Sequence, residues 1–507
     1  MLAFSGHQRL EFLQREPSLL RTLDKLQSLQ RISGVTSVTI RLATHLTDQP
    51  FSFVEPNARR RQPTLFRQLT NIHRHTLLDI KVNFKLSLRL HPLRSQPMTP
   101  FEPLQLPNGQ ILANRIAKAA MEENMADLQQ APSVELKQLY KAWADGEPGL
   151  LLTGNVMIDR HAMTGPGGVA LEDEQHLDSF REWADAARVK GVHFWVQLSH
   201  PGRQTMANLG QQALAPSAVA LDLGGFSKMF AKPRAMTEDD IQDVIKRFAT
   251  SARLAEKAGF TGVQIHGAHG YLISQFLSPL SNQRTDRWGG SLENRARLLL
   301  EVINAVRANV SPAFCVAVKL NSADFQRGGF AEADARAVVE MLNPLPIDLL
   351  ELSGGSYEAP AMQGDARDGR TLAREAYFLE FAQALTSVAK MPLMVTGGIR
   401  RLPIVQQVLD SGIAMAGIAT ALTLEPQLIK HWREGRDLNP QLKPINWQRK
   451  PLAALATLAV VRYQMRRLSR GFLPDAKIAP WLALVRDQWF IARRTRQYRA
   501  TMTQSSH

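Results

Sequence analysis

The residues with the clearest chemical potential lie in segment 262–271, which reads Gly-Val-Gln-Ile-His-Gly-Ala-His-Gly-Tyr. His266 ends a short apolar run, and His269 and Tyr271 follow where the predicted strand opens into a loop. Two imidazoles and one phenol are therefore expected near one strand end. Such a set of hydrogen-bonding groups suits the polarisation of a carbonyl or nitro oxygen and the delivery of a proton.

Two other interpretations of these histidines have to be weighed. A histidine at a strand end is most often a structural residue whose hydrogen bonds are satisfied within the protein. His266 and His269 also suit a metal site, because imidazole is a common metal ligand. The sequence offers no clear carboxylate or cysteine partner for them, so we expect no metal here.

Length and cysteine content restrict the class of protein. The chain has 507 residues, enough for a barrel-sized domain with extensions. Its single cysteine, Cys315, excludes an intramolecular disulfide and an iron–sulfur cluster held within one chain. We therefore expect a reducing, cytoplasmic location. No long uninterrupted apolar run and no secretory-signal pattern appear in the sequence.

The net charge of +15 is carried by the two ends of the chain. Residues 1–97 hold 15 Lys/Arg and 6 Asp/Glu, residues 432–507 hold 15 and 4, and the middle is therefore at −5. A basic arm for nucleic acid or a membrane is one interpretation of 1–97. We prefer a poorly ordered extension, or a segment upstream of a true translation start at Met98. We expect no nucleic-acid partner and no stable membrane insertion.

Between Phe101 and Trp432 the chain alternates strand-like and helix-like segments, which predicts a (β/α)₈ TIM barrel. No Gly-x-Gly-x-x-Gly motif follows the first predicted strand, which argues against a Rossmann unit. The eight predicted strands are Arg115–Met121, Gly149–Ile158, His193–His200, Gly262–His266, Cys315–Asn321, Leu349–Ser353, Pro392–Gly397 and Ala416–Ala421. The predicted helices include Leu177–Val189, Asp239–Ala258, Leu292–Val310, Ala331–Leu342, Arg374–Ala389 and Pro403–Ser411.

Chemistry in such a barrel is located at the carboxyl ends of the strands. Lys319 lies in the fifth predicted strand, where a buried lysine needs an anionic or electron-rich partner. Gly397 and Gly398 follow the seventh strand, and Ala419 and Thr420 end the eighth. Turns at these two places are where this fold tends to hold a phosphate on backbone N–H groups.

Several ordered motifs make the middle of the chain resemble the old yellow enzyme family of FMN-dependent oxidoreductases. The resemblance extends from about Phe101 to Trp432 and includes neither end of the chain. The motifs are segments 114–121, 197–203 (Gln-Leu-Ser-His-Pro-Gly-Arg), 266–272 (His-Gly-Ala-His-Gly-Tyr-Leu), 275–279 and 282–295 (Asn-Gln-Arg-Thr-Asp-Arg-Trp-Gly-Gly-Ser-Leu-Glu-Asn-Arg).

The resemblance implies FMN at the barrel mouth, reduced by NADH or NADPH. It places the backbone of Ala119 and Met121 against the isoalloxazine, Gly154 beside it and the Gln197 amide on its pyrimidine edge. Lys319 would lie near the N1–C2 carbonyl, where a cation stabilises the reduced flavin. The phosphate would contact Gly397, Gly398, Ala419 and Thr420.

The resemblance also implies roles toward a small electrophilic substrate. His266 and His269 would hold the oxygen of its electron-withdrawing group. Tyr271 would protonate one carbon of the activated C=C bond while hydride reaches the other. The function predicted is thus an ene-reductase-type NAD(P)H:flavin oxidoreductase. The alternatives are a flavin-dependent amine demethylase or dehydrogenase, and a non-catalytic binding protein on a decayed barrel.

Three positions depart from the family pattern. Lys319 occupies the position of an arginine that is common in the family. The lysine supplies a point charge, whereas arginine would supply a planar fork of donors. Thr420 occupies the position where the phosphate-binding arginine is expected, so we predict weaker FMN retention. Met121 occupies the position where some relatives carry a redox-tuning cysteine or threonine.

Residues 433–507 are predicted to form a basic helical extension after the 98–432 barrel. Leu452–Met465 and Trp481–Ala492 have helical spacing. Arginines with interspersed Trp481, Trp489 and Phe490 also suit a membrane surface. We prefer packing on the acidic barrel or on a second subunit, which leaves a homo-oligomer open.

Overall fold

The computed structural model describes residues 98–360 and 375–504. The expectations for residues 1–97, namely an extension preceding the barrel and a start at Met98, concern residues outside this description.

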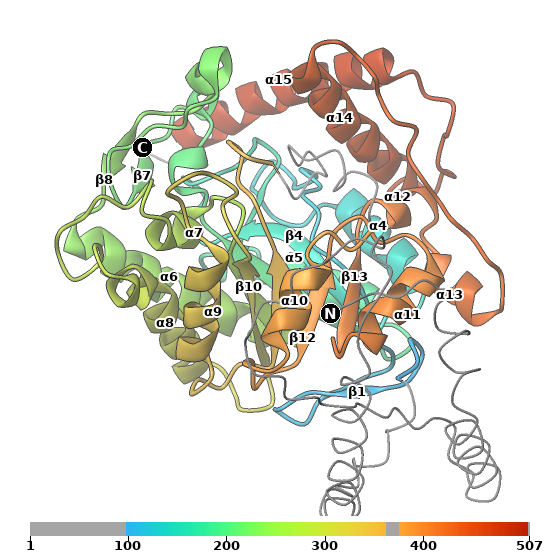
Figure 1. Ribbon diagram of the computed structural model, residues 1–507. Coiled ribbons are helices and arrows are strands. Elements are labelled where there is room, and N and C mark those ends of the chain that lie inside the picture. The colour runs from blue at the N-terminus through green and yellow to red at the C-terminus, as the bar shows by residue number, and fades with distance from the viewer. Residues whose placement is uncertain (1–97, 361–374, 505–507) are drawn as a thin grey trace, which may run out of the picture. The chain divides into compact units, whose positions relative to one another are not determined.

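Eight parallel strands close into a barrel, as the sequence predicted (Figure 1). Each strand pairs in parallel with its neighbours, and β3 pairs with both β4 and β13, which completes the circle. The barrel strands are β3 (Ile116–Lys118), β4 (Leu150–Met157), β6 (His193–Ser199), β9 (Gly262–Gly267), β10 (Cys315–Asn321), β11 (Leu349–Ser353), β12 (Leu393–Thr396) and β13 (Met415–Ile418). The short β5 (Val169–Ala170) pairs with the end of β4.

Helices pack around this barrel (Figure 1). Side-chain caps begin two of them: Thr237 and Asp240 form a capping box at α6, and the Ser291 side chain accepts from the Asn294 N–H at α8. The helix predicted at 374–389 is the shorter α10. The helices are α4 (Val134–Ala144), α5 (Leu177–Ala187), α6 (Glu238–Lys257), α7 (Leu272–Leu277), α8 (Leu292–Ala308), α9 (Glu332–Leu342), α10 (Leu379–Leu385), α11 (Leu402–Asp410), α12 (Ala421–Leu424) and α13 (Leu428–Arg433).

The barrel core explains why the strands have apolar residues on both faces. Side chains such as Trp195, Ala317 and Met394 fill the barrel interior, and a larger apolar cluster lies between strands and helices. The hairpin of β1 (Leu104–Gln105) and β2 (Ile111–Leu112) covers the end where the strands begin. We therefore expect a ligand to enter from the opposite end, where the strands finish.

An excursion between β6 and α6 extends from that opposite end. It contains η1 (Gly202–Gln204), η2 (Ala207–Leu209), β7 (Ala213–Ala215), η3 (Gly224–Met229) and β8 (Pro233–Ala235). Strands β7 and β8 form a separate two-stranded sheet. These loops rise above the strand ends and supply Phe230, discussed below.

The C-terminal extension is helical, as predicted, and forms a hairpin of α14 (Lys450–Leu468) and α15 (Pro480–Gln504) that packs against the barrel loops. Arg494 donates to the carbonyls of Ala126 and Asp127 at 2.8 and 2.6 Å, and the Tyr498 hydroxyl donates to the Arg160 carbonyl at 2.7 Å. Trp481 and Trp489 are exposed on its outer side. Within the described residues, no helix combines the length and apolar character needed to cross a membrane.

Candidate active site

One cavity lies at the carboxyl ends of the barrel strands and collects six of the predicted site residues. Strands β6, β9 and β10 and the loops after β3 and β9 supply these side chains. Ala120, Glu122 and Asn155 complete the lining and were not predicted. The predicted residues on the lining are Met121, Gln197, His266, His269, Tyr271 and Lys319.

His266 is a buried neutral imidazole whose tautomer is fixed by its own loop. The Ala268 N–H donates to Nδ1 at 3.2 Å, so the ring proton resides on Nε2. Burial and the nearby Lys319 ammonium hold the pKa of His266 well below its ordinary value. The ring is therefore a hydrogen-bond donor rather than a cation at neutral pH.

His269 is held beside it in an unusual backbone conformation. Its φ is +60°, in the left-handed region, and its N–H donates to Asn321 Oδ1 at 3.0 Å. Its Nε2 lies 2.8 Å from Ser353 Oγ, and the two imidazole rings meet edge to face at 5.0 Å. Burial also lowers the pKa of His269, with smaller contributions from the neighbouring lysine and histidine. A strained loop of this kind fixes the direction of the side chain.

Tyr271 belongs to a pair of phenols. Its hydroxyl lies 3.0 Å from the Tyr357 hydroxyl and accepts from Asn155 Nδ2 at 3.1 Å. Its ring packs edge to face on His266 at 4.8 Å. Burial raises the pKa of Tyr271 well above its ordinary value. The phenol therefore retains its proton and presents it beside the two imidazoles.

The expected anionic partner of Lys319 is Glu351 on the neighbouring strand. The two residues are in register between β10 and β11, and Nζ lies 2.9 Å from Oε1. Gln264 donates to the other carboxylate oxygen at 2.7 Å, and Gln197 donates to Gln264 at 2.7 Å. This buried chain fixes both Gln197 and Lys319 at the cavity wall.

Ala119 and Gly154 do not line the cavity; they support its floor. Ala119 donates its N–H to the Ile418 carbonyl at 2.8 Å, which joins the first and last strands. A Cβ added at Gly154 would lie 2.2 Å from the Met121 carbonyl oxygen, and the Gly154 N–H donates to Glu123 at 3.0 Å. Glycine is thus required there by the close approach of the loop after β3.

The predicted phosphate residues follow β12 and β13, which are adjacent in the sheet. Gly397 and Gly398 have φ values of +140° and +71°, and the Tyr377 ring lies where a Cβ on Gly398 would be. Thr420 begins α12 and is exposed. These residues lie outside the lining of the described cavity.

Besides Ala120 and Asn155, sequence reasoning missed four residues that shape the site: Glu122, Tyr357, Glu351 and Arg462. Glu351 occupies a predicted strand, and a carboxylate inside an otherwise apolar strand is a signal that could have paired it with Lys319. Arg462 lies 340 positions from Glu122 in the chain, and nothing in its local sequence indicates that contact.

Within the described residues, His, Cys, Asp and Glu side chains form no group of three arranged to hold a metal ion. A closed (β/α)₈ barrel with hydrogen-bond donors and a buried cation at the carboxyl ends of its strands is a framework on which enzymes place their active sites. Residues 100–439 match the model of the NADH:flavin oxidoreductase / NADH oxidase family. The chain belongs to this family, which confirms the resemblance drawn from the motifs and makes the protein an NADH-dependent flavin oxidoreductase.

Curated relatives agree. The chain is 35% identical over 377 residues to the NADH-dependent flavin oxidoreductase nadA of Aspergillus parasiticus, covering 71% of this chain and 83% of that protein. It is 38% identical over 354 residues to the NADH-dependent flavin oxidoreductase iliE of a Neonectria species, covering 65% of this chain but only 46% of that protein.

Solved structures share the fold. The old yellow enzyme homologue from Zymomonas mobilis aligns with a TM-score of 0.58 and 26% identity, covering 69% of this chain and 95% of that one. Morphinone reductase aligns with a TM-score of 0.57 and 24% identity, covering 70% and 93%. The predicted barrel is thereby confirmed.

Proposed function

We propose that the chain binds FMN, accepts reducing equivalents from NADH or NADPH and passes hydride to an activated C=C bond. The observation that carries this proposal is the convergence of His266, His269 and Tyr271 with Gln197 and Lys319 on one cavity. The first three residues are donors toward a substrate oxygen and carbon, and the other two suit the polar edge of a flavin.

The chemistry of the donor set fits FMN. Lys319 is only 3% exposed yet lines the cavity, so its charge is available to an anionic or electron-rich ring placed there. When bound, FMN supplies two-electron hydride chemistry that no side chain provides. Met121 and Gln197 would hold the ring, whereas Gly397, Gly398, Ala419 and Thr420 would hold the phosphate.

The residues of this chain would then orient the substrate and move one proton. The Nε2–H of His266 and a nitrogen of His269 hold the carbonyl or nitro oxygen and stabilise the charge that develops there. Tyr271 breaks its O–H bond and protonates the carbon next to the electron-withdrawing group. Hydride reaches the other carbon, so the π bond of C=C is replaced by two new C–H bonds and a C–C single bond remains.

The test uses the purified full chain supplied with FMN. Reoxidation of the NADH-reduced protein by cyclohexenone is the expected result, and Tyr271→Phe should slow it about 100-fold or more. Reduction of the oxidised protein by an amine would instead support the demethylase or dehydrogenase alternative. Failure to take up FMN would favour a decayed barrel.

The proposal includes a small electrophilic molecule as partner and a cytoplasmic location. The location rests on Cys315, which is free and buried. A homo-oligomer is compatible with the exposed tryptophans of the C-terminal hairpin. Fractionation of cells expressing the full chain tests the location, and recovery in a membrane or secreted fraction would contradict it.

A further inference from the structure

Glu122 places a carboxylate in the wall of the candidate active site. It follows β3, lines the cavity with Tyr271 and has a side chain that is 22% exposed. The Thr164 hydroxyl donates to its Oε1, and its Oε2 lies 3.5 Å from Arg462 Nη2. The charge of this lining carboxylate is thus opposed by an arginine from the C-terminal hairpin.

Arg462 comes from α14, beyond residue 439 where the family match ends. Its Nη1 lies 3.2 Å from Asp487 Oδ2 on α15, and Arg466 binds the other oxygen of Asp487 at 2.7 Å. Asp487 is only 2% exposed in its side chain. Two arginines and two carboxylates therefore form a chain that leads from the hairpin interior to the cavity.

The hairpin is docked by contacts separate from this chain. Arg494 bonds two carbonyls of the loop after β3, and the Tyr498 hydroxyl bonds Arg160. Tyr498 and Met502 also pack with Met157. Loss of the Arg462 charge alone is therefore not expected to detach the hairpin.

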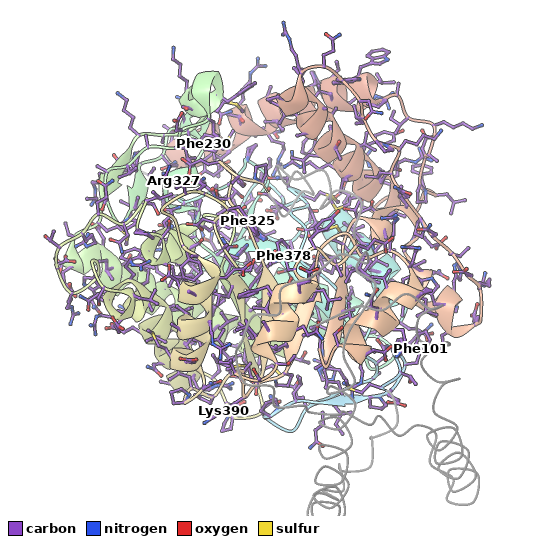
Figure 2. All side chains as sticks on the ribbon, viewed as in Figure 1. Phe101, Phe230, Phe325, Arg327, Phe378 and Lys390 are labelled. Carbon is purple, nitrogen blue, oxygen red and sulfur yellow. The ribbon has the colours of Figure 1, made fainter. Side chains whose placement is uncertain are left out.

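The Arg462–Glu122 pair acts on the two phenols. Negative charge on Glu122 raises the pKa of both Tyr271 and Tyr357, whereas positive charge on Arg462 lowers the pKa of Tyr357; burial is the larger cause of the elevation in each. The other groups facing the pair are Asn155 and His266 at Tyr271, and the Phe230 ring 6.0 Å from the Tyr357 ring. Phe230 is labelled in Figure 2, in the excursion between β6 and α6. An uncompensated Glu122 would hold both protons more tightly.

We propose that Arg462 is a positioning residue of the active site, which neutralises Glu122 so that the Tyr271–Tyr357 pair can release a proton to substrate. The C-terminal hairpin would then contribute to the electrostatics of the active site through Arg462. This inference rests on the proposed role of Tyr271 as proton donor. After Tyr271 gives its proton to the substrate carbon, the Tyr357 O–H bond breaks and a new O–H bond forms on Tyr271; water then reprotonates Tyr357.

The experiment compares two half-reactions of the full-length, FMN-loaded protein by stopped flow. Arg462→Gln is expected to slow reoxidation by cyclohexenone about 10- to 100-fold and to change reduction by NADH less than about twofold. The solvent deuterium isotope effect on reoxidation should rise, because proton transfer becomes slower. Arg470→Gln, at an exposed arginine just after α14, is the matched control and should change neither rate.

Rescue separates an electrostatic role from a merely structural one. Glu122→Gln combined with Arg462→Gln should restore reoxidation to within about threefold of the unmodified protein, because the charge that Arg462 opposes is gone. Glu122→Gln alone should accelerate reoxidation a few-fold, and this single variant tests the idea even where Arg462→Gln folds poorly. FMN content and the thermal midpoint of each variant report on folding independently of turnover.

Three outcomes would overturn the inference: an equal slowing of both half-reactions in Arg462→Gln, no rescue in the double variant, or slower reoxidation in Glu122→Gln. An unmodified protein that no enone reoxidises would defeat the proposed function itself, and this inference with it. The first three outcomes arise in a protein that does reduce enones, so the two failures are distinguishable.

Discussion

Two buried lysines at the carboxyl ends of barrel strands have different surroundings. Lys118 on β3 is fully buried; its Nζ donates to the Tyr140 hydroxyl at 2.9 Å and the Leu152 carbonyl at 2.6 Å, and lies over the Trp143 ring. Glu123 lies 3.8 Å away. Burial lowers the pKa of Lys118 to about 8, against the opposing effect of Glu123.

Lys319 on β10 has one carboxylate partner, Glu351, and lines the cavity. Its neighbours there are two neutral imidazoles rather than an aromatic cage. Both lysines are buried, so burial of a charge does not by itself identify a functional residue. What distinguishes Lys319 is that its ammonium adjoins a space that another molecule can enter.

The largest expected effect tests whether Lys118 is a structural residue that stabilises the fold. Lys118→Met leaves Glu123 and the Tyr140 hydroxyl without their cation, and we expect a loss of about 4 kcal/mol in the free energy of unfolding. Urea denaturation measures it. Arg336→Met, in the exposed pair of Arg336 with Glu340, is the control and should cost less than about 0.5 kcal/mol. A Lys118 variant as stable as this control would remove the contrast.

Acid should destabilise the fold through His200, a buried neutral histidine. Burial lowers the pKa of His200 to about 4, so below its unfolded value near 6.5 the unfolded chain binds a proton that the folded chain does not. Stability is therefore lost as the pH falls from about 6.5 to about 4, by roughly 3 kcal/mol for this residue. His200→Asn should flatten the dependence in urea denaturation; an unchanged slope would contradict it.

Lys319→Met tests the proposed role of Lys319 beside the flavin. Removing a cation aimed at developing negative charge is expected to slow flavin reduction by NADH about 100-fold, or about 2.7 kcal/mol. Lys319→Arg keeps the charge and should retain most of the rate, measured by stopped flow on FMN-loaded protein. Equal rates for the methionine variant and the unmodified protein would leave Lys319 with only the role that Lys118 has.

The smallest expected effect concerns Thr420, at the proposed phosphate site. In contrast to the two lysine positions, this position carries no charge. Thr420→Arg adds a cation beside the turn at Gly398 and should tighten FMN binding about 10-fold, or about 1.4 kcal/mol. Fluorescence titration of the flavin-free protein with FMN measures the dissociation constant. Thr420→Ser is the control. An arginine that binds FMN no more tightly would refute the assignment of this position.

Most of the fold was predictable because parallel strands buried on both faces are continuous apolar runs. Cys315–Asn321 and Leu349–Ser353 have the predicted bounds. The first and last strands are shorter than predicted, since Ala119 and Ala419 already belong to the loops that follow them. The pattern of apolar residues shows where a strand lies. The residue at which the strand ends depends on how the following loops pack, which the pattern does not show.

The site was predictable where its residues are neighbours in sequence. His266, His269 and Tyr271 share one strand end, so their proximity follows from chain geometry. The contacts of Tyr271 with Tyr357 and of Glu122 with Arg462 join distant segments. A single sequence indicates local spacing and strand order. It does not reveal which distant loops or helices contact each other above the strand ends.

The hairpin of α14 and α15 has a practical consequence for anyone who handles this protein. A chain cut after residue 439, where the family match ends, would lack Arg462, Arg494 and Tyr498, and with them the arginine that faces Glu122. Substitutions in this hairpin are accordingly expected to change the surroundings of Glu122 while they leave all eight strands untouched.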